Sequence, residues 1–226
     1  MIETRANFGF MLVGLILLWS TAPIMSLATG AADIILYLVL GAALCLGAWS
    51  LAREARYFVP AATLIVLAVI CAIITLFTGN ALAKYLTLIF QIVFWAMSGW
   101  FVGRHVLTTG PVDWNRIAGA ICIYLIAAIL WALMFVLLNQ INPDSFHGLG
   151  DVPFEDQFAE LMYFSTVTLT TLGYGDVTPA SPYARWLAQV EAVFGQLYIA
   201  ILIAALVGNW IALAAIKGAK DDDLQR

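Results

Sequence analysis

The stretch that decides the architecture of this chain is Thr170-Thr171-Leu172-Gly173-Tyr174-Gly175-Asp176. Gly173 and Gly175 can adopt backbone angles that a Cβ forbids, so alternate peptide groups can turn their carbonyl oxygens toward one axis. Thr171 adds a hydroxyl oxygen at one end of this row, and Tyr174 supplies a bulky ring that can brace the strand. A Gly-rich turn between two strands has a similar composition, so the surrounding sequence must distinguish the two.

The rest of the chain has the composition of an integral membrane protein. Of its 226 residues, 63% are hydrophobic and 11% are charged, whereas about a quarter of the residues of a typical soluble domain are charged. Several apolar stretches are long enough to span, since about 20 helical residues cross a hydrocarbon core of about 30 Å. These six predicted spans are 8–29, 34–52, 61–78, 85–103, 117–138 and 186–216.

A shorter segment, 154–170, lies between the last two spans and runs directly into the glycines. Its length favours a re-entrant helix over a span. We expect this helix to begin near Pro153, with acidic residues in its first turn that complement the helix dipole, and to end near Leu169 or Thr170. The sequence therefore predicts an all-α membrane protein with six transmembrane helices, a re-entrant helix and a loop.

The basic residues indicate the orientation in the membrane, because lysines and arginines gather on the cytoplasmic side. With both termini in the cytoplasm, every lysine and arginine except Lys84 and Arg185 lies on the inner side. The same orientation places the Gly173–Gly175 loop on the outer face.

The stretch from about 117 to 210 resembles the pore domain of tetrameric potassium channels. Tyr163-Phe164-Ser165 stands where that family often has two aromatic residues and a small one, and Thr168-Leu169-Thr170-Thr171 leads into the selectivity filter. Asp176, Pro179, Arg185 and Gly195 then follow in the family's order. The resemblance implies a prokaryotic-type potassium channel with six transmembrane helices and one pore loop, located in the cell membrane.

In this family, rings of backbone carbonyls replace the hydration shell of the ion. The resemblance therefore implies that K⁺ binds along the filter and passes through it passively. The implied ion-binding residues are Thr171, Leu172, Gly173, Tyr174 and Gly175, with K⁺ at the first four. One chain carries one loop and a filter needs four, so a homotetramer in contact with membrane lipids is implied. Neither a cofactor other than K⁺ nor nucleic acid is expected, and nothing resembles an enzyme site.

The chain divides into 1–110, 111–216 and 217–226. The first part shares with the family only the architecture of a four-helix domain similar to a voltage sensor, the second is the pore domain, and the third is a cytoplasmic tail too short for a soluble ligand-binding domain. A voltage-sensing fourth span carries basic residues at every third position, because each elementary charge contributes about 2.3 kcal/mol per 100 mV. The fourth span, 85–103, has none, so we expect weak or absent voltage dependence.

Several residues are expected to support the filter. The family places a hydrogen bond behind Asp176, usually from a tryptophan, so here the partner is the Tyr163 hydroxyl or is missing. Val167 stands where some relatives have a carboxylate, which excludes a carboxylate pair with Asp176. Thr168 and Thr170 complete the supporting layer. An outer group of acids attracts cations or serves only solubility: Asp144, Asp151, Glu155, Asp156, Glu160 and Asp176.

The last span is expected to line the pore. Gly195 is either a hinge, since a helical glycine costs roughly 1 kcal/mol relative to alanine, or a small residue for close packing. The helices are expected to converge and to close the pore near Ala204, Val207 and Gly208. Glu191, an acid within a span, is either a proton-sensitive brace between helices, with Thr168 as partner, or a packing residue that does not titrate.

The sequence leaves three alternatives to a potassium-selective channel. Leu172 occupies the position of the family's usual valine, and its larger, γ-branched side chain must pack behind the filter, which suggests a less selective cation pore. A secondary transporter would have paired broken helices at the membrane midplane, and the first half has no counterpart of the segment 154–170. A sensor or scaffold that keeps a pore-like loop without conducting is the third alternative.

Overall fold

The computed structural model describes residues 8–20, 55–107, 114–150 and 154–224, and most of them are helical. The helices are α1 (Phe8–Ser20), α4 (Ala55–Thr78), α5 (Ala81–Leu107), α6 (Trp114–Ile141), α7 (Phe154–Leu169) and α8 (Pro182–Leu224). Two short strands, β1 (Phe146–His147) and β2 (Thr178–Pro179), pair antiparallel. The predicted span 34–52 and the second half of the first span lie outside the described residues.

Four helices in the described part of the chain are long and apolar enough to cross a membrane, and α1 is a shorter apolar helix. They are α4 from Phe58, α5 to Val106, all of α6, and the first part of α8, Pro182–Ala205. The chain is therefore an α-helical membrane protein. The predicted spans 61–78, 85–103 and 117–138 lie within these helices, and the span predicted at 186–216 overlaps Pro182–Ala205. α8 continues to Leu224, so most of the predicted tail is helical.

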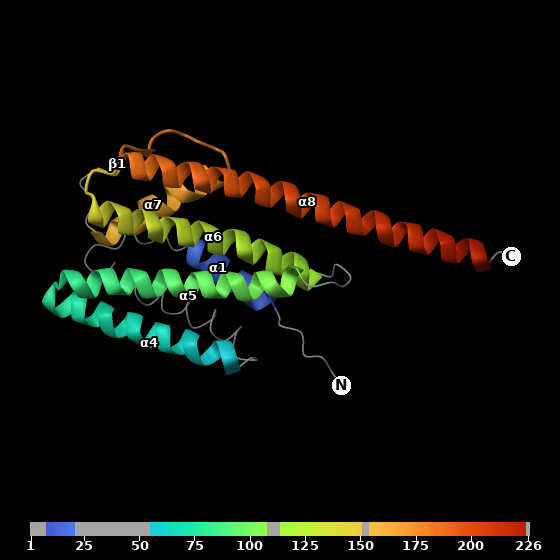
Figure 1. Ribbon diagram of the computed structural model, residues 1–226, viewed down its shortest axis with the longest axis horizontal. Coiled ribbons are helices and arrows are strands. Elements are labelled where there is room, and N and C mark those ends of the chain that lie inside the picture. The colour runs from blue at the N-terminus through green and yellow to red at the C-terminus, as the bar shows by residue number, and fades with distance from the viewer. Residues whose placement is uncertain (1–7, 21–54, 108–113, 151–153, 225–226) are drawn as a thin grey trace.

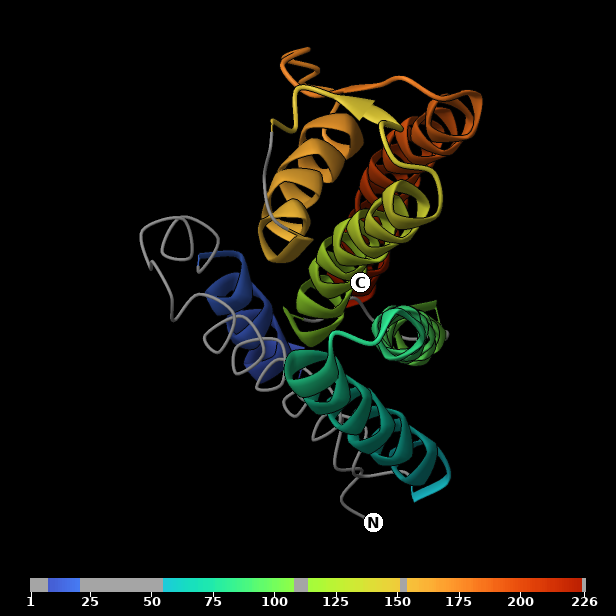
Figure 2. The ribbon, with the colours of Figure 1, turned by 90° about the vertical axis from the view of Figure 1, so that its left-hand side faces the viewer.

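α6 is the centre of the arrangement, because it contacts α1, α5, α7 and α8. Figure 1 shows α4, α5, α6 and α8 running lengthwise, with α8 extending far beyond the others toward the C-terminus. In the end-on view of Figure 2, α7 lies beside α6 and α8, while α4 and α1 lie on the other side of the molecule. The small buried residues Ala118, Gly119, Ala128 and Ala132 of α6 allow neighbouring helices to approach closely.

The start of α1 is fixed against the start of α6. The Phe8 N–H donates to Asn115 Oδ1 at 2.8 Å. A Cβ on Gly119 would lie 2.7 Å from Val106 Cγ2 and 3.0 Å from the Phe8 ring, so this contact between α1, α5 and α6 depends on a glycine. The beginnings of α1 and α6 therefore lie at the same end of the bundle.

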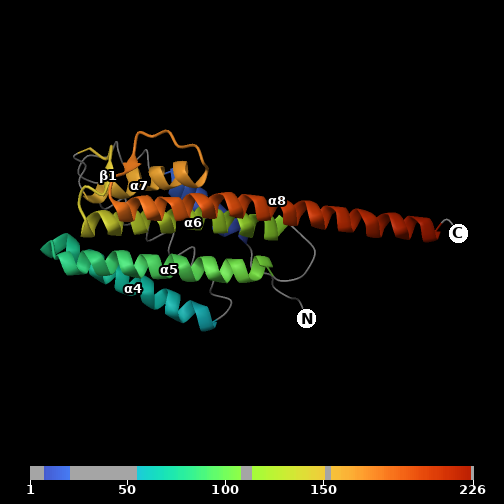
Figure 3. The same ribbon diagram turned by 45° about the horizontal axis from the view of Figure 1, so that its top comes forward.

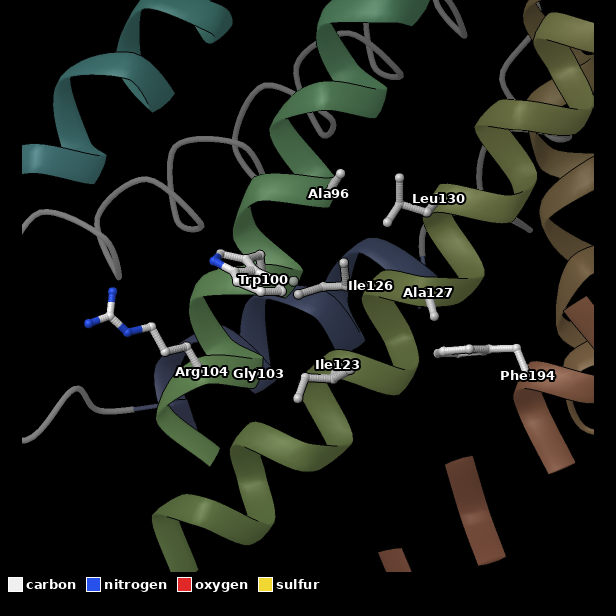
Figure 4. Close-up of a pocket in the computed structure, with 10 residues that line it drawn as sticks. Ala96, Trp100, Gly103, Arg104, Ile123, Ile126, Ala127, Leu130 and Phe194 are labelled. Carbon is white, nitrogen blue, oxygen red and sulfur yellow. The ribbon is translucent and has the colours of Figure 1, made fainter. Parts of the chain in front are cut away.

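An apolar groove of about 550 Å³ lies between α5 and α6 and reaches Phe194 of α8. Figure 4 shows Ile123, Ile126 and Ala127 along one wall, with Phe194 directed toward Ala127. Arg104 lies at its edge, and its side chain points away from the groove. The groove therefore brings residues of α5, α6 and α8 together.

The loops before α7 and before α8 meet at one end of the bundle, where Figure 3 shows β1 close to α7. Phe146 pairs with Pro179, and His147 with Thr178. The rings of Phe135, Phe146 and Phe164 contact one another edge to face, with centroids 5.1 to 5.4 Å apart. The prediction of an all-α chain missed this strand pair, whose four residues join segments about thirty residues apart and show no periodic pattern.

Candidate functional site

The end of α7 sets the direction of the filter stretch, which is Thr170–Asp176. The Thr171 N–H donates to the Thr168 carbonyl at 3.0 Å, and the Leu172 N–H donates to the Val167 carbonyl at 2.9 Å. These two bonds form a Schellman motif, in which the residue after the helix usually is a glycine in the left-handed conformation. Here that residue is Thr171, with φ of 61°. A β-branched residue with this φ is an outlier, and such strain is concentrated at functional sites.

The backbone after Thr171 alternates in handedness. The φ angles of Thr171, Gly173 and Gly175 are 61°, 58° and 80°, whereas Leu172 and Tyr174 are not among the residues with positive φ. Such alternation at every second residue is what a row of carbonyls on one side of the chain requires. The sequence predicted this role for the two glycines. The participation of Thr171 was not predicted, because threonine gives no sign of a left-handed conformation.

The filter stretch projects from its own chain. All residues from Thr170 to Asp176 are exposed, and the side chains of Leu172 and Tyr174 are 55% and 67% exposed. The Leu172 side chain therefore does not pack behind the filter within one chain, and the Tyr174 ring does not brace it there. Any packing of these two side chains needs atoms from outside this chain.

Asp176 is held by α7. The Tyr163 hydroxyl donates to Asp176 Oδ2 at 2.6 Å, so of the two alternatives left by the sequence the structure shows the hydroxyl partner. This hydrogen bond lowers the pKa of Asp176, against a smaller opposing effect of desolvation, and it raises the pKa of Tyr163 to about 12. On the other side, a Cβ on Gly148, whose φ is 88°, would overlap the Asp176 carbonyl oxygen.

The predicted supporting residues act largely through their backbones. The Val167 carbonyl accepts from Leu172 and, at 3.3 Å, from Gly173, while the Val167 side chain is buried. The Thr168 carbonyl accepts from Thr171, and the Thr170 hydroxyl donates to the Thr166 carbonyl at 2.7 Å. The side chain of α7 that reaches Asp176 is therefore that of Tyr163.

Gly195 meets the end of α7. A Cβ at this position would overlap the Leu169 carbonyl oxygen, which also accepts a hydrogen bond from the Tyr124 hydroxyl at 3.0 Å. This contact favours the packing alternative for Gly195, and the hinge stays a prediction, since α8 is one helix through this point. Sequence reasoning missed Tyr124, although a tyrosine within an apolar span signals a hydroxyl in need of a partner. It also missed Gln196, whose Nε2 lies 3.4 Å from Thr171 Oγ1.

Glu191 is fully buried, and its partner is Ser165 rather than Thr168. The expectation that Thr168 is the partner of Glu191 was wrong, because the register between α7 and α8 does not bring these two residues together. Glu191 lies level with Ser165, and one turn further along Gly195 lies level with Leu169. Thr168, which precedes Leu169, is therefore nearer to the filter than Glu191 is.

The predicted gate and the outer acids are only partly described. Ala204 and Gly208 are exposed on α8, and the side chain of Val207 lies outside the described residues, as do those of Asp151, Glu155 and Asp156. Asp144 is exposed and Glu160 is half-buried. The structure of one chain brings neither set together.

Comparison with known proteins identifies relatives of part of this chain. Residues 119–211 match the family model described as "Ion channel". The chain is 32% identical over 79 residues to two-pore potassium channel 5 of Arabidopsis thaliana, 30% over 90 residues to protein LctB of Bacillus caldotenax, and 29% over 106 residues to the inward rectifier potassium channel Kirbac3.1 of Paramagnetospirillum magnetotacticum. These matches cover 35%, 38% and 46% of this chain, and 18%, 66% and 32% of the relatives.

Proposed function

Through its residues 119–211 this chain belongs to the potassium channel family, and on that premise we propose that it conducts K⁺ passively across the membrane. The proposed ion-binding groups are the carbonyl oxygens of 171–175 together with the Thr171 hydroxyl. The observation that carries this proposal is the alternation of φ at Thr171, Gly173 and Gly175. A row of carbonyls can replace the water shell of an ion only if they face one axis.

The proposal includes a homotetramer, because one chain supplies one filter strand of the four that a potassium filter needs. Two features support it. The filter stretch has no cover from its own chain, and α8 presents an exposed apolar stripe of Val190, Val193, Leu197 and Ile201. In a tetramer, residues of neighbouring chains would pack against the exposed side chains of Leu172 and Tyr174.

We place the inner end of the pore on α8, with closure near Ala204, Val207 and Gly208. Apolar rings at a constriction can gate by dewetting. The α8 contact between Gly195 and the Leu169 carbonyl lies between this gate and the filter. Movement of the part of α8 that follows Gly195 would therefore leave the filter in place.

The competing function is a monovalent cation channel of lower selectivity, which Leu172 suggests. Its side chain is exposed within one chain, so its effect on the filter depends on the neighbouring subunit. A non-conducting sensor or scaffold is the other alternative. K⁺ flux and Na⁺ flux into liposomes that contain the purified chain together separate all three, because the selective channel passes K⁺ alone, the weakly selective channel passes both ions and the scaffold passes neither.

The experiment that tests the proposal compares two glycines with nearly the same backbone conformation. Gly173 has φ of 58° and Gly79, in the α4–α5 turn, has φ of 63°, and a Cβ on either meets no atom within 4 Å. Alanine therefore costs roughly 1–2 kcal/mol at both positions. We expect Gly173→Ala to abolish selective K⁺ flux while Gly79→Ala retains it. Equal flux through both variants would contradict the assignment of 171–175 as the filter.

A further inference from the structure

Glu191 of α8 lies fully inside its own chain, at the junction of three helices. Its exposed fraction is 0% before any neighbouring subunit is considered. Its Oε1 lies 2.5 Å from Ser165 Oγ of α7, and its Oε2 is buried without a hydrogen-bond partner. A neighbouring chain in the proposed tetramer therefore adds on the outside of this junction and does not reach the carboxyl group.

Ser165 Oγ has two neighbours and a single hydrogen. It lies 2.5 Å from Glu191 Oε1 and 2.9 Å from the carbonyl oxygen of Ala128 in α6. A carbonyl oxygen can only accept, so the contact with Ala128 is a hydrogen bond only if the serine hydrogen points there. The contact with Glu191 is then a hydrogen bond only if the carboxyl group carries the proton and donates it to Ser165.

The ionised alternative leaves several groups without compensation. The serine hydrogen would turn to Glu191, the Ala128 contact would lose its hydrogen, and the Oε2 lone pairs would face an apolar interior with a negative charge. Among the described residues, no lysine or arginine forms an ion pair with Glu191. The ionisable group near it on α6 is Tyr124, whose hydroxyl is engaged with the Leu169 carbonyl, and its hydrogen-bond partner on α7 is Ser165.

We propose that Glu191 is protonated at neutral pH and that it is a positioning residue for the pore helix. The protonated carboxyl group donates a hydrogen bond to Ser165 Oγ, and the Ser165 hydroxyl donates one to the Ala128 carbonyl, so two hydrogen bonds in series tie α8 to α7 and α7 to α6. On α8, these hydrogen bonds lie one turn before the contact between Gly195 and Leu169. The two hydrogen bonds fix the position of α7 along its axis relative to α6 and α8, and therefore the position of the start of the filter. Only this last step depends on the proposed function.

Infrared spectroscopy of the purified full chain in lipid bilayers tests the protonation directly. We expect the difference spectrum between wild type and Glu191→Gln to show the C=O stretching band of a protonated carboxyl group, lost in the variant. We expect Ser165→Ala to shift that band to higher frequency, because the carboxyl loses its acceptor. Glu160→Gln is the matched control, since Glu160 lies half-buried at the other end of α7, and we expect it to leave the band unchanged.

A spectrum without such a band in the wild type, or a band that Ser165→Ala does not move, would overturn the proposal. The positioning role is tested by rescue. Glutamine can still donate an N–H to Ser165, whereas alanine cannot, so we expect Glu191→Gln to retain selective K⁺ flux and Glu191→Ala to lose it. Loss of flux in both variants would refute the positioning role of this hydrogen bond, and the infrared band would still decide the protonation. If the wild type itself does not conduct, the proposed function fails while the infrared band still decides the protonation.

Discussion

The hydrogen bond from Tyr163 to Asp176 joins α7 to the outer end of the filter stretch. Both groups lie at the surface of the single chain, and the carboxylate also accepts from the Val177 N–H at 3.0 Å. The bond thus fixes the residue that directly follows Gly175. A filter held this way depends on a hydroxyl where many relatives use a tryptophan, as the resemblance to the family implies.

We predict that Tyr163→Phe, which keeps the ring and removes the hydroxyl, accelerates the decay of K⁺ current during a sustained opening. The physical reason is that Asp176 loses its side-chain donor and the filter gains freedom. Currents through the reconstituted variant measure the decay. Tyr183→Phe is the control, because Tyr183 is 70% exposed at the start of α8 and its replacement leaves the hydrogen bond from Tyr163 to Asp176 in place. Unchanged decay in Tyr163→Phe would remove this role from the hydrogen bond.

The pKa shifts of the pair predict a pH window. The pKa of Asp176 lies below its ordinary 3.8, so its contribution is present above that value and is lost as the pH falls through the lowered pKa. The pKa of Tyr163 is raised from 10.0 to about 12, so its contribution is complete below 10.0 and is lost as the pH rises through about 12. We expect the current decay to be constant between about pH 5 and about pH 9. A titration near neutral pH that disappears in Asp176→Asn would contradict this assignment.

The residues of the site were predictable to the extent that their chemistry is local. Gly173 and Gly175 signal unusual backbone angles by themselves. The left-handed conformation of Thr171 is imposed by the end of α7, and the partnership of Glu191 with Ser165 follows from the register of α7 against α8. Neither the capping bonds nor the register leaves a mark in the sequence.

At the scale of the helices, α7 and α8 approach closely where Gly195 faces the Leu169 carbonyl. We predict that Gly195→Ala lowers the free energy of unfolding by about 1–3 kcal/mol, because the added methyl group overpacks a contact with backbone atoms. Thermal unfolding of the purified protein measures the change.

Gly103→Ala is the matched control for this substitution. Gly103 is also a helical glycine, but a Cβ there would lie 3.9 Å from Ile123 Cδ1, an ordinary contact. We expect Gly103→Ala to be neutral or to stabilise by up to about 1 kcal/mol. If Gly195→Ala is equally stable but fails to open, the packing interpretation is wrong and the hinge is favoured.

The helices could be predicted from the length of the apolar segments and from the residues expected at helix ends. The short α7 was predicted from an apolar segment too short to span, and its start and end at Phe154 and Leu169 agree with the expected bounds. The strand pair β1–β2 could not be predicted, because its pairing depends on how the loops around α7 meet after the helices have packed.

At the scale of the whole protein, the distribution of charged residues along α5 determines whether voltage can open the pore. Lys84 lies in the first turn of α5, and Arg104 and His105 lie in its last turn, so the apolar part between them carries no gating charge. We predict a conductance that changes little with voltage, since a voltage sensor needs several charges at about 2.3 kcal/mol each per 100 mV. The slope of the conductance–voltage curve measures this. A slope that corresponds to several elementary charges would contradict the prediction.

The assembly could be inferred from the sequence only through the filter, because a single chain contains one strand of a shared structure. The structure adds that this strand and the apolar stripe of α8 are exposed in one chain. Crosslinking in membranes is expected to give a ladder that ends at four copies.

The ion selectivity of the pore is tested most directly by the reversal potential of single channels in planar bilayers, with K⁺ on one side and Na⁺ on the other. If the carbonyls of 171–175 form a potassium filter, the reversal potential follows the K⁺ gradient and shifts with it when only K⁺ is changed. A reversal potential near zero in the mixed solutions, with Na⁺ carrying current as well as K⁺, would contradict a potassium-selective filter.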